Sequence, residues 1–340
     1  MRTSQDPCRM DAGRRAALLG LAALATPTVL GRPARAQAGG LEAVATEAAG
    51  LDQLHALVIR RGGDTLFERA FAGPGLDAVA NVKSVSKTLV ALLTGIAIER
   101  GAIAGAETRV LAALGRPAAG DVRDEITLGD LLSMRAGLAG TSGGSYGAWV
   151  ASRDWVDHAL TREVVAEPGG RFIYSTGGWH VLGAVLARAT GRDLLALARD
   201  WLGEPLGIEI PPWERDPQGR YMGGNQMALT PRALARVGEM VAGGGRWDGA
   251  QVVPARWIER SWEPRGRSPF SGDSYGYGWF LTRHAGRRVA YGRGYGGQVL
   301  AVAPEIDLVI AITSDPGRPA RSAGYFGDLQ RLMGRIVVTV

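Results

Sequence analysis

The sequence predicts an α+β fold, in which one antiparallel sheet is flanked by helices and interrupted by a mostly helical subdomain. Three observations lead to this prediction. Strand-like segments lie near both ends of the chain, helical and glycine-rich patterns fill the middle, and 46% of the 340 residues are hydrophobic, which is enough for a full core. We therefore assign residues 39–104 and 231–340 to a sheet domain and residues 105–230 to an insertion, with residues 1–38 as a separate leader.

The N-terminal part of the sheet domain is predicted to be a hairpin followed by a long helix. Leu54–Arg60 and Thr65–Phe71 read as two strands joined by a turn at residues 62–64. A helix is predicted from Ser84 to about Arg100, closed by Gly101. This helix is apolar nearly all round, so we expect it to lie in the centre of the molecule.

The later elements are helices in the insertion and strands near the C-terminus. Ile126–Met134 and Gly178–Ala189 are the clearest helices of the insertion. Thr230 and Pro231 are an N-cap and a first helical residue, and they open a helix that ends near Val241. After a short helix around Trp257, we expect four strands of a meander and a last helix: Gly276–Leu281, Arg288–Tyr291, Gln298–Val302, Leu308–Thr313 and Gly327–Val337.

The first 38 residues have the layout of a secretory signal peptide. Arg14-Arg15 precedes an apolar run over residues 16–25, and small-x-small cleavage signals follow at residues 34–36 and 36–38. The run is too short to span a bilayer, which takes about 20 residues, so we expect no stable membrane anchor after cleavage. The paired arginines indicate the twin-arginine route. The sequence therefore predicts a periplasmic or secreted protein.

Most of the net positive charge of the chain lies in this leader. Residues 1–38 carry six arginines and two aspartates, so the rest of the chain has 33 basic and 31 acidic residues. This near balance argues against a nucleic-acid partner. The sole cysteine, Cys8, also lies in the leader, and a chain without it has neither disulfide nor thiolate chemistry.

Ser84 and Lys87 are the strongest candidates for catalysis. The chain has 39 lysines and arginines, yet only Lys83 and Lys87 are lysines. A buried lysine can lose its proton and act as a base, whereas arginine stays protonated. Lys87 follows Ser84 by three residues, so both share one helix face, and Ser84 lies at the positive end of the helix. The pattern fits a nucleophile and its activator, although an N-cap serine beside a snorkelling lysine gives the same spacing.

Ser84-Val85-Ser86-Lys87 resembles the active-site motif of the serine β-lactamase and penicillin-binding-protein superfamily. The segments 126–138, 244–249 and 275–279 resemble later landmarks of that superfamily, so the resemblance covers nearly all the chain after the leader. Within it, the chain is most similar to the class C-like branch of esterases, D-aminopeptidases and 6-aminohexanoate-dimer hydrolases, and most of all to the last. The resemblance implies a β-lactamase-like fold and an acyl-enzyme mechanism.

Tyr174-Ser175-Thr176 matches the second motif of this branch, Tyr-x-Asn. The resemblance implies that the Tyr174 hydroxyl shares proton transfer with Lys87, activates Ser84 and protonates the leaving group. A buried tyrosine followed by a helix cap is the structural alternative. Thr176 departs from the asparagine of the family, which usually contacts the substrate amide. We keep Thr176 as a substrate-binding candidate.

The segment 292–298 stands where the family has its third motif, Lys-Thr-Gly or His-x-Gly. Tyr295, Gly296 and Gly297 are the expected equivalents and the expected substrate-binding residues, and the backbone N–H groups of Ser84 and Gln298 are expected to form the oxyanion hole. An ordinary glycine-rich hairpin is the alternative. The glycines also satisfy Gly-x-Gly-x-x-Gly, but they lie between two strands and do not open a helix, so a dinucleotide site is excluded. Arg293 is a candidate to replace the missing lysine as a partner for a substrate carboxylate.

The predicted function is hydrolysis of a small linear amide or carboxylic ester by a secreted serine hydrolase without a cofactor. The four histidines show no metal-ligand spacing, so no metal site is expected. A Ser–His–Asp triad using His180 is a minor alternative, because no Gly-x-Ser-x-Gly motif supports it. A β-lactamase or a D-amino-acid peptidase remains an alternative within the family. A non-catalytic relative that binds cell-wall peptides is the alternative of another class.

Overall fold

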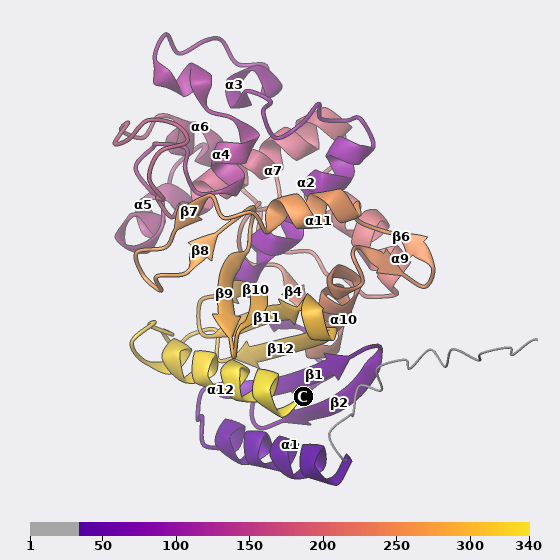
Figure 1. Cartoon of the computed structure of the whole chain (residues 1–340). Helices are drawn as coiled ribbons and strands as arrows, with labels where there is room; N and C mark the ends of the chain where they lie inside the picture. The colour runs from indigo at the N-terminus through magenta and orange to yellow at the C-terminus, as the bar shows by residue number, and fades with distance from the viewer. Residues whose placement is uncertain (1–33) are drawn as a thin grey trace, which may run out of the picture.

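The computed structural model describes residues 34–340, and Figure 1 shows the sheet in the lower half of the molecule with most helices above it. Residues 1–33 of the predicted signal peptide lie outside the described residues. Its last five residues, 34–38, fall within the first helix, α1 (Ala34–Ala49). Within residues 34–340, no helix combines the length and the apolar character that a membrane crossing requires.

Both ends of the described chain contribute to one antiparallel sheet, as the sequence predicts. Over residues 34–340 this sheet has eight strands in the order β2-β1-β12-β11-β10-β9-β8-β7, so the N-terminal hairpin pairs with the last strand. The strands are β1 (Leu54–Arg61), β2 (Asp64–Ala70), β7 (Gly266–Arg267), β8 (Ser274–Tyr275), β9 (Phe280–His284), β10 (Arg287–Gly294), β11 (Gln298–Ala303) and β12 (Leu308–Ser314). Two short ribbons pair β3 (Ala80–Asn81) with β4 (Ala228–Leu229) and β5 (Arg246–Trp247) with β6 (Ala250–Gln251).

One predicted strand is wrong. Residues Gly276–Leu281 do not form a single strand, because a tight turn separates β8 from β9. The N–H of Gly276 donates to the Trp279 carbonyl oxygen at 2.9 Å, and Gly278 has a φ of +80°. Glycine adopts this left-handed conformation without strain, so Gly278 allows the chain to reverse where the sequence pattern predicts a continuous strand.

Helices lie on both sides of the sheet. The helices α1 (Ala34–Ala49) and α12 (Tyr325–Thr339) lie side by side at the lower end of the molecule in Figure 1. Helix α10 (Pro231–Ala242) packs on β1, β11 and β12. The other helices are α2 (Ser86–Glu99), α3 (Val110–Ala113), α4 (Leu128–Leu132), α5 (Tyr146–Val150), α6 (Trp155–Leu160), α7 (Thr176–Thr190), α8 (Leu194–Ala198), α9 (Glu204–Leu206) and α11 (Ala255–Ser261), with a π-helical turn at Arg199–Gly203.

Helix α2 is the central helix of the fold. Every residue from Ser86 to Ala97 is buried, as the apolar pattern predicts. The helix contacts α7, α11 and β10, and Thr88 Oγ1 on it donates to the Gly278 carbonyl oxygen at 2.7 Å. The predicted start at Ser84 lies instead in a one-turn 3₁₀ helix, Lys83–Val85, that leads directly into α2. The stiff central helix therefore fixes the turn that carries Ser84.

Candidate active site

A cavity of about 760 Å³ opens where the 3₁₀ turn before α2, the start of α7 and the end of β10 meet. It is lined by residues from all three elements and from the loops around them. Lys83, Arg293 and Arg321 bring positive charge to the wall, and no Asp or Glu is among the described residues that line it. The lining also includes Ser84, Ser142, Tyr146, Tyr174, Thr176, Asn225, Gln226, Phe270, Phe280, Gly294 and Tyr295.

The structure brings Ser84 and Lys87 together. Ser84 lies in the 3₁₀ turn, half-buried and facing the cavity, and Lys87 Nζ donates to Ser84 Oγ at 2.9 Å. Lys83, directly before Ser84, has a φ of +50°, a left-handed conformation that costs free energy in a residue with a side chain. The turn therefore holds Ser84 in a fixed and locally strained position.

Lys87 is a buried amine surrounded by neutral acceptors. Only 2% of the residue is exposed, and its Nζ also donates to Thr176 Oγ1 at 3.2 Å and to the Gly224 carbonyl oxygen at 2.6 Å. No carboxylate of the described residues forms an ion pair with it. Burial holds the pKa of Lys87 well below its ordinary value. The uncharged amine that a general base requires is therefore reached at a lower pH than for an ordinary lysine.

Tyr174 completes the group around Ser84. Its hydroxyl hydrogen bonds with Ser84, and Lys87 Nζ lies 5.0 Å from the centre of its ring. Burial raises the pKa of the Tyr174 hydroxyl, and the Ser84 hydrogen bond and the nearby positive charge of Arg293 oppose this shift only in part. The hydroxyl therefore stays protonated near neutral pH.

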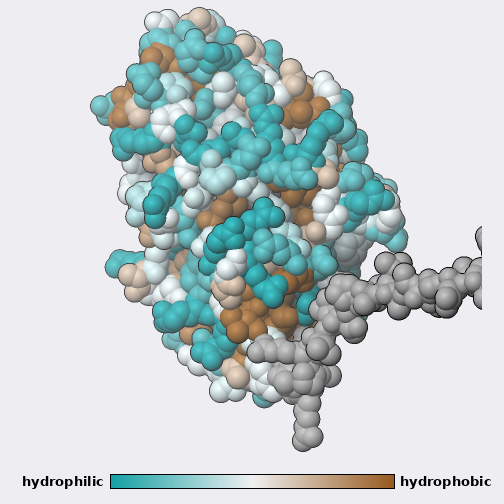
Figure 2. Space-filling view, viewed as in Figure 1, coloured by the Kyte–Doolittle hydropathy of each residue, from teal (hydrophilic) through white to brown (hydrophobic). Residues whose placement is uncertain are grey.

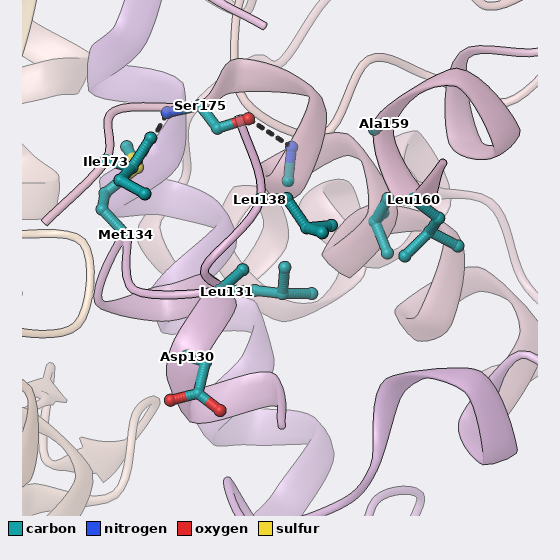
Figure 3. Close-up of a pocket in the computed structure, with 11 residues that line it drawn as sticks. Asp130, Leu131, Met134, Leu138, Ala159, Leu160, Ile173 and Ser175 are labelled. Carbon is teal, nitrogen blue, oxygen red and sulfur yellow. Dashed lines mark hydrogen bonds between the residues drawn. The ribbon is translucent and has the colours of Figure 1, made fainter. Parts of the chain in front are cut away.

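The backbone around Tyr174 is anchored by the segment that follows α4. Figure 3 shows Ser175 between Met134 and the first turn of α7. The N–H of Ser175 donates to Met134 Sδ at 3.3 Å, and its Oγ accepts from the Gly178 N–H at 3.2 Å. The pocket drawn there measures about 20 Å³, which is too small for a substrate and marks only a gap in packing between Leu131, Leu138 and their neighbours.

Thr176 lies at the site, but in contact with the lysine. Its Oγ1 accepts from Lys87 Nζ and hydrogen bonds with Ser142 Oγ at 2.9 Å. Sequence reasoning missed Ser142, which reaches the site from a loop 34 residues earlier in the chain. It also missed Gly224, because a backbone carbonyl leaves no signal in residue type.

The third predicted motif divides into two parts. Arg293, Gly294 and Tyr295 line the cavity, and Gly294 approaches the start of the 3₁₀ turn of Ser84 so closely that a Cβ there would lie 2.4 Å from the Val82 carbonyl oxygen. Arg293 donates to Ser322 Oγ at 2.9 Å and to the Ala320 carbonyl oxygen at 2.7 Å, and its guanidinium lies 3.6 Å from the centre of the Phe326 ring. Its side chain is thus held in place at the cavity wall.

The other three residues of that prediction do not reach the cavity. A Cβ on Gly296 would lie 2.3 Å from the Asp315 carbonyl oxygen, and one on Gly297 would lie 2.5 Å from Tyr325 Cε1. Gln298 is fully buried, and its side chain exchanges hydrogen bonds with the Ser314 backbone at 2.8 and 3.1 Å. The two glycines shape the β10–β11 turn, because only glycine fits so close to its neighbours.

The triad alternative does not fit the position of His180. The residue is fully buried in α7, where its Nε2 bonds to Asp216 Oδ2 at 3.1 Å and its Nδ1 accepts from the Gly223 N–H at 3.3 Å. Both ring nitrogens are therefore occupied away from Ser84. Over residues 34–340, no three His, Cys, Asp or Glu side chains are grouped so that they could hold a metal ion.

Comparison with known proteins identifies the family of the chain from its sequence and finds the same fold among solved structures. The family model described as Beta-lactamase matches residues 48–331. The chain is 28% identical over 337 residues to 6-aminohexanoate-dimer hydrolase from Paenarthrobacter ureafaciens, covering 87% of this chain and 84% of the relative. A penicillin-binding protein homologue from Caulobacter crescentus has a TM-score of 0.72 at 18% identity, covering 90% and 98% of the two chains. A family VIII carboxylesterase has a TM-score of 0.70 at 18% identity, covering 91% and 99%.

Proposed function

The chain belongs to the beta-lactamase family and is a hydrolase of the β-lactamase fold, and from this premise we propose that it cleaves small linear amides or carboxylic esters through an acyl-enzyme on Ser84. The observation that carries the proposal is the set of three hydrogen bonds at Lys87. We also propose that the protein is secreted and acts on a small-molecule substrate. It needs no cofactor and has no nucleic-acid partner.

Counting hydrogen-bond donors assigns the base. A neutral amine has two N–H groups and one lone pair. The Gly224 carbonyl oxygen can only accept, so it takes one N–H, and Thr176 Oγ1 takes the other. In the ammonium form the third N–H donates to Ser84 Oγ, 2.9 Å away. In the neutral form the lone pair of Lys87 takes the place of that N–H and can accept the hydroxyl proton of Ser84. Lys87 removes this proton as Ser84 attacks the substrate carbonyl.

The shifts in pKa separate the roles of Lys87 and Tyr174. Burial lowers the pKa of Lys87 and raises the pKa of Tyr174, so the amine is the proton acceptor and the phenol keeps its proton. Tyr174 then orients Ser84 and donates a hydrogen bond to the reacting groups. The sequence predicts a shared role for these two residues, and the opposed shifts support dividing it.

We assign the oxyanion hole to the backbone N–H groups of Ser84 and Tyr295. Tyr295 lines the cavity and follows Gly294, which lies close to the 3₁₀ turn of Ser84. Gln298 is buried and is not among the residues that line the cavity. Two N–H groups aimed at the developing oxyanion stabilise the tetrahedral intermediate. Water then attacks the acyl-enzyme and releases the acid.

The cavity supports an apolar or negatively charged substrate. Phe270 and Tyr295 are 67% and 54% exposed, and both line the cavity, where they offer apolar surface to an acyl chain. The three cations of the wall favour a carboxylate on the substrate over an ammonium group. Thr176 and Tyr295 stand where the family motifs carry other residues, which argues against efficient β-lactam hydrolysis.

A fluorophosphonate probe tests the proposal against a binding protein without activity. We expect the wild type to be labelled and Ser84→Ala to remain unlabelled. A folded wild-type protein that takes up no label would overturn the proposed nucleophile.

A substrate panel orders the candidate activities. We expect turnover of 4-nitrophenyl butyrate or 6-aminohexanoate dimer to exceed turnover of nitrocefin, with Ser84→Ala inactive on all three. Faster hydrolysis of nitrocefin would instead make the chain a β-lactamase. Release of D-amino acids from a D-alanyl dipeptide as the fastest reaction would favour the peptidase alternative.

A further inference from the structure

A chain of hydroxyl groups runs from Lys87 to the cavity. Lys87 Nζ lies 3.2 Å from Thr176 Oγ1, and Thr176 Oγ1 lies 2.9 Å from Ser142 Oγ. Thr176 is 3% exposed, whereas Ser142 is half-buried, and both line the cavity that contains Ser84. The amine is therefore connected to the cavity by a second path besides its direct bond to Ser84.

The hydrogen bonds allow a proton to pass along this path from Lys87 to the cavity. Thr176 Oγ1 accepts from Lys87, so its own proton is free to bond to Ser142 Oγ. Ser142 Oγ also accepts from the N–H of Thr176 at 2.9 Å. Either oxygen can be the donor in the Thr176–Ser142 bond. When Thr176 donates, both lone pairs of Ser142 are used and its hydroxyl proton points to another acceptor. The described residues provide no further partner for it, and the cavity is the open space beside it.

We propose that Ser142 is the residue that gives the leaving group its proton, and that Lys87 resupplies this proton through Thr176. The proposal rests on the acyl-enzyme mechanism proposed above. As the tetrahedral intermediate collapses, the bond from the carbonyl carbon to the leaving oxygen or nitrogen breaks, and its electron pair takes the Ser142 hydroxyl proton. Ser142 takes a proton from Thr176, and Thr176 takes one from the Lys87 ammonium, which returns to the neutral amine that began the reaction.

Thr176 is suited to this relay and Tyr174 is not. A hydroxyl can accept one proton while it gives up another, whereas an amide side chain in its place donates and accepts without passing the proton on. Among the described residues, the hydrogen-bond partner of the Tyr174 hydroxyl is Ser84, so Tyr174 is not connected to Lys87 through Thr176 and Ser142.

Ser142 also has a structural role that the test has to separate. The first N–H groups of α7 donate to hydroxyls: Thr176 N–H to Ser142, and Gly177 N–H to Thr141 Oγ1 at 2.6 Å. Thr141 is fully buried and does not line the cavity, so Thr141→Val removes an equivalent cap without touching the relay. It is the matched control.

The experiment compares leaving groups that share one acyl group. 4-Nitrophenolate leaves as an anion, whereas an alkoxide needs a proton as it leaves, so kcat/KM is measured for 4-nitrophenyl butyrate and ethyl butyrate. We expect Ser142→Ala and Thr176→Val to slow the ethyl ester on the order of 100-fold, the loss typical of a missing general acid, and the nitrophenyl ester far less. Thr176→Ser restores the ethyl ester, and Thr141→Val slows both esters alike if it slows them at all.

The outcomes separate the two proposals. A wild type that hydrolyses neither ester and does not hydrolyse 6-aminohexanoate dimer overturns the proposed function. A wild type that hydrolyses only the nitrophenyl ester overturns the relay, and so does a Ser142→Ala variant whose losses on both esters are equal. A loss in Thr141→Val that is as selective for the ethyl ester as the loss in Ser142→Ala assigns the effect to helix capping and overturns the relay as well.

Discussion

At the scale of single residues, the proposed chemistry depends on the choice of lysine at position 87. The chain uses arginine for all but two of its 39 basic side chains, and one of these two lysines lies buried against Ser84. Arginine cannot give up its proton in a protein, so it cannot act as a base in this position. Lys87 contacts three neutral oxygens. A permanently charged side chain buried in the same position would need a carboxylate partner.

Replacing this lysine by arginine is expected to abolish turnover. Lys87→Arg keeps the charge but loses the base, so we expect kcat/KM to fall by at least about 1000-fold. Steady-state hydrolysis of 4-nitrophenyl butyrate measures the loss, and circular dichroism checks that the variant is folded. Near wild-type turnover by the folded variant would remove Lys87 from the mechanism.

The pH dependence follows from the same group. The neutral amine is the base and burial lowers the pKa of Lys87, so kcat/KM is expected to rise as the pH rises through that lowered pKa. The rise therefore ends at a lower pH than an ordinary lysine would allow, and Tyr174, with its raised pKa, adds no loss near neutral pH. A pH–rate profile of the wild type measures this. A rate that falls steadily as the pH increases would contradict the assignment of Lys87.

At the scale of elements, the loop before β4 is as important as the helices, because it supplies the Gly224 carbonyl to Lys87. The loop is anchored by the buried pair His180–Asp216 and by the bond from the Gly223 N–H to His180. Arg220 adds an ion pair with Asp216 at 3.1 Å. His180, the histidine of the triad alternative, therefore contacts this loop and holds it in place beside Lys87.

Gly224→Ala tests the position of that carbonyl. A Cβ at Gly224 would lie 2.6 Å from Trp179 Cβ and 3.4 Å from Lys87 Cγ, so the loop has to shift. We expect kcat to fall on the order of 100-fold, since a displaced carbonyl no longer orients the amine. Gly144→Ala is the matched control, because its Cβ would meet nothing within 4 Å. Equal activities of the two variants would show that the Gly224 carbonyl does not matter.

At the scale of the whole molecule, the two ends of the described chain stabilise each other. Helices α1 and α12 pack together, with Val44 and Ala48 of α1 fully buried. Glu47 on α1 forms an ion pair with Arg335 on α12. In the view of Figure 2, hydrophilic residues cover most of the surface and hydrophobic residues form small separate patches. Helix α1 is therefore part of the fold.

Truncation tests how much of this helix the fold needs. Removing residues 1–38 deletes the first five residues of α1 but keeps the buried Val44 and Ala48, so the free energy of unfolding is expected to stay unchanged, whereas removing residues 1–50 removes both buried residues. The second deletion is expected to cost about 2 kcal/mol or more. Urea unfolding of both truncated chains measures the difference. Equal stabilities would mean that α1 contributes nothing to the fold.

Export is tested on the same segment. In a host with a twin-arginine pathway, we expect the full chain to reach the periplasm and to begin there at Gln37 or Gly39, after the two cleavage signals. Mass spectrometry of the periplasmic fraction identifies the first residue, and Arg14→Lys with Arg15→Lys is the control that should block export. An uncut chain in the cytoplasm would refute the proposed leader.

The sequence by itself determined the α+β class, the two-ended sheet, the apolar central helix and the pairing of Ser84 with Lys87. These follow from periodicity and from spacing within one helical turn, which are local properties. Only the tertiary structure decided that Thr176 contacts the lysine, that Ser142 and the Gly224 carbonyl join it, and that Tyr295, but not Gln298, lines the cavity. Such contacts join residues from 34 to 137 positions apart, and a backbone carbonyl is the same for every residue type. Their chemistry exists only once α2, α7 and the neighbouring loops are packed together.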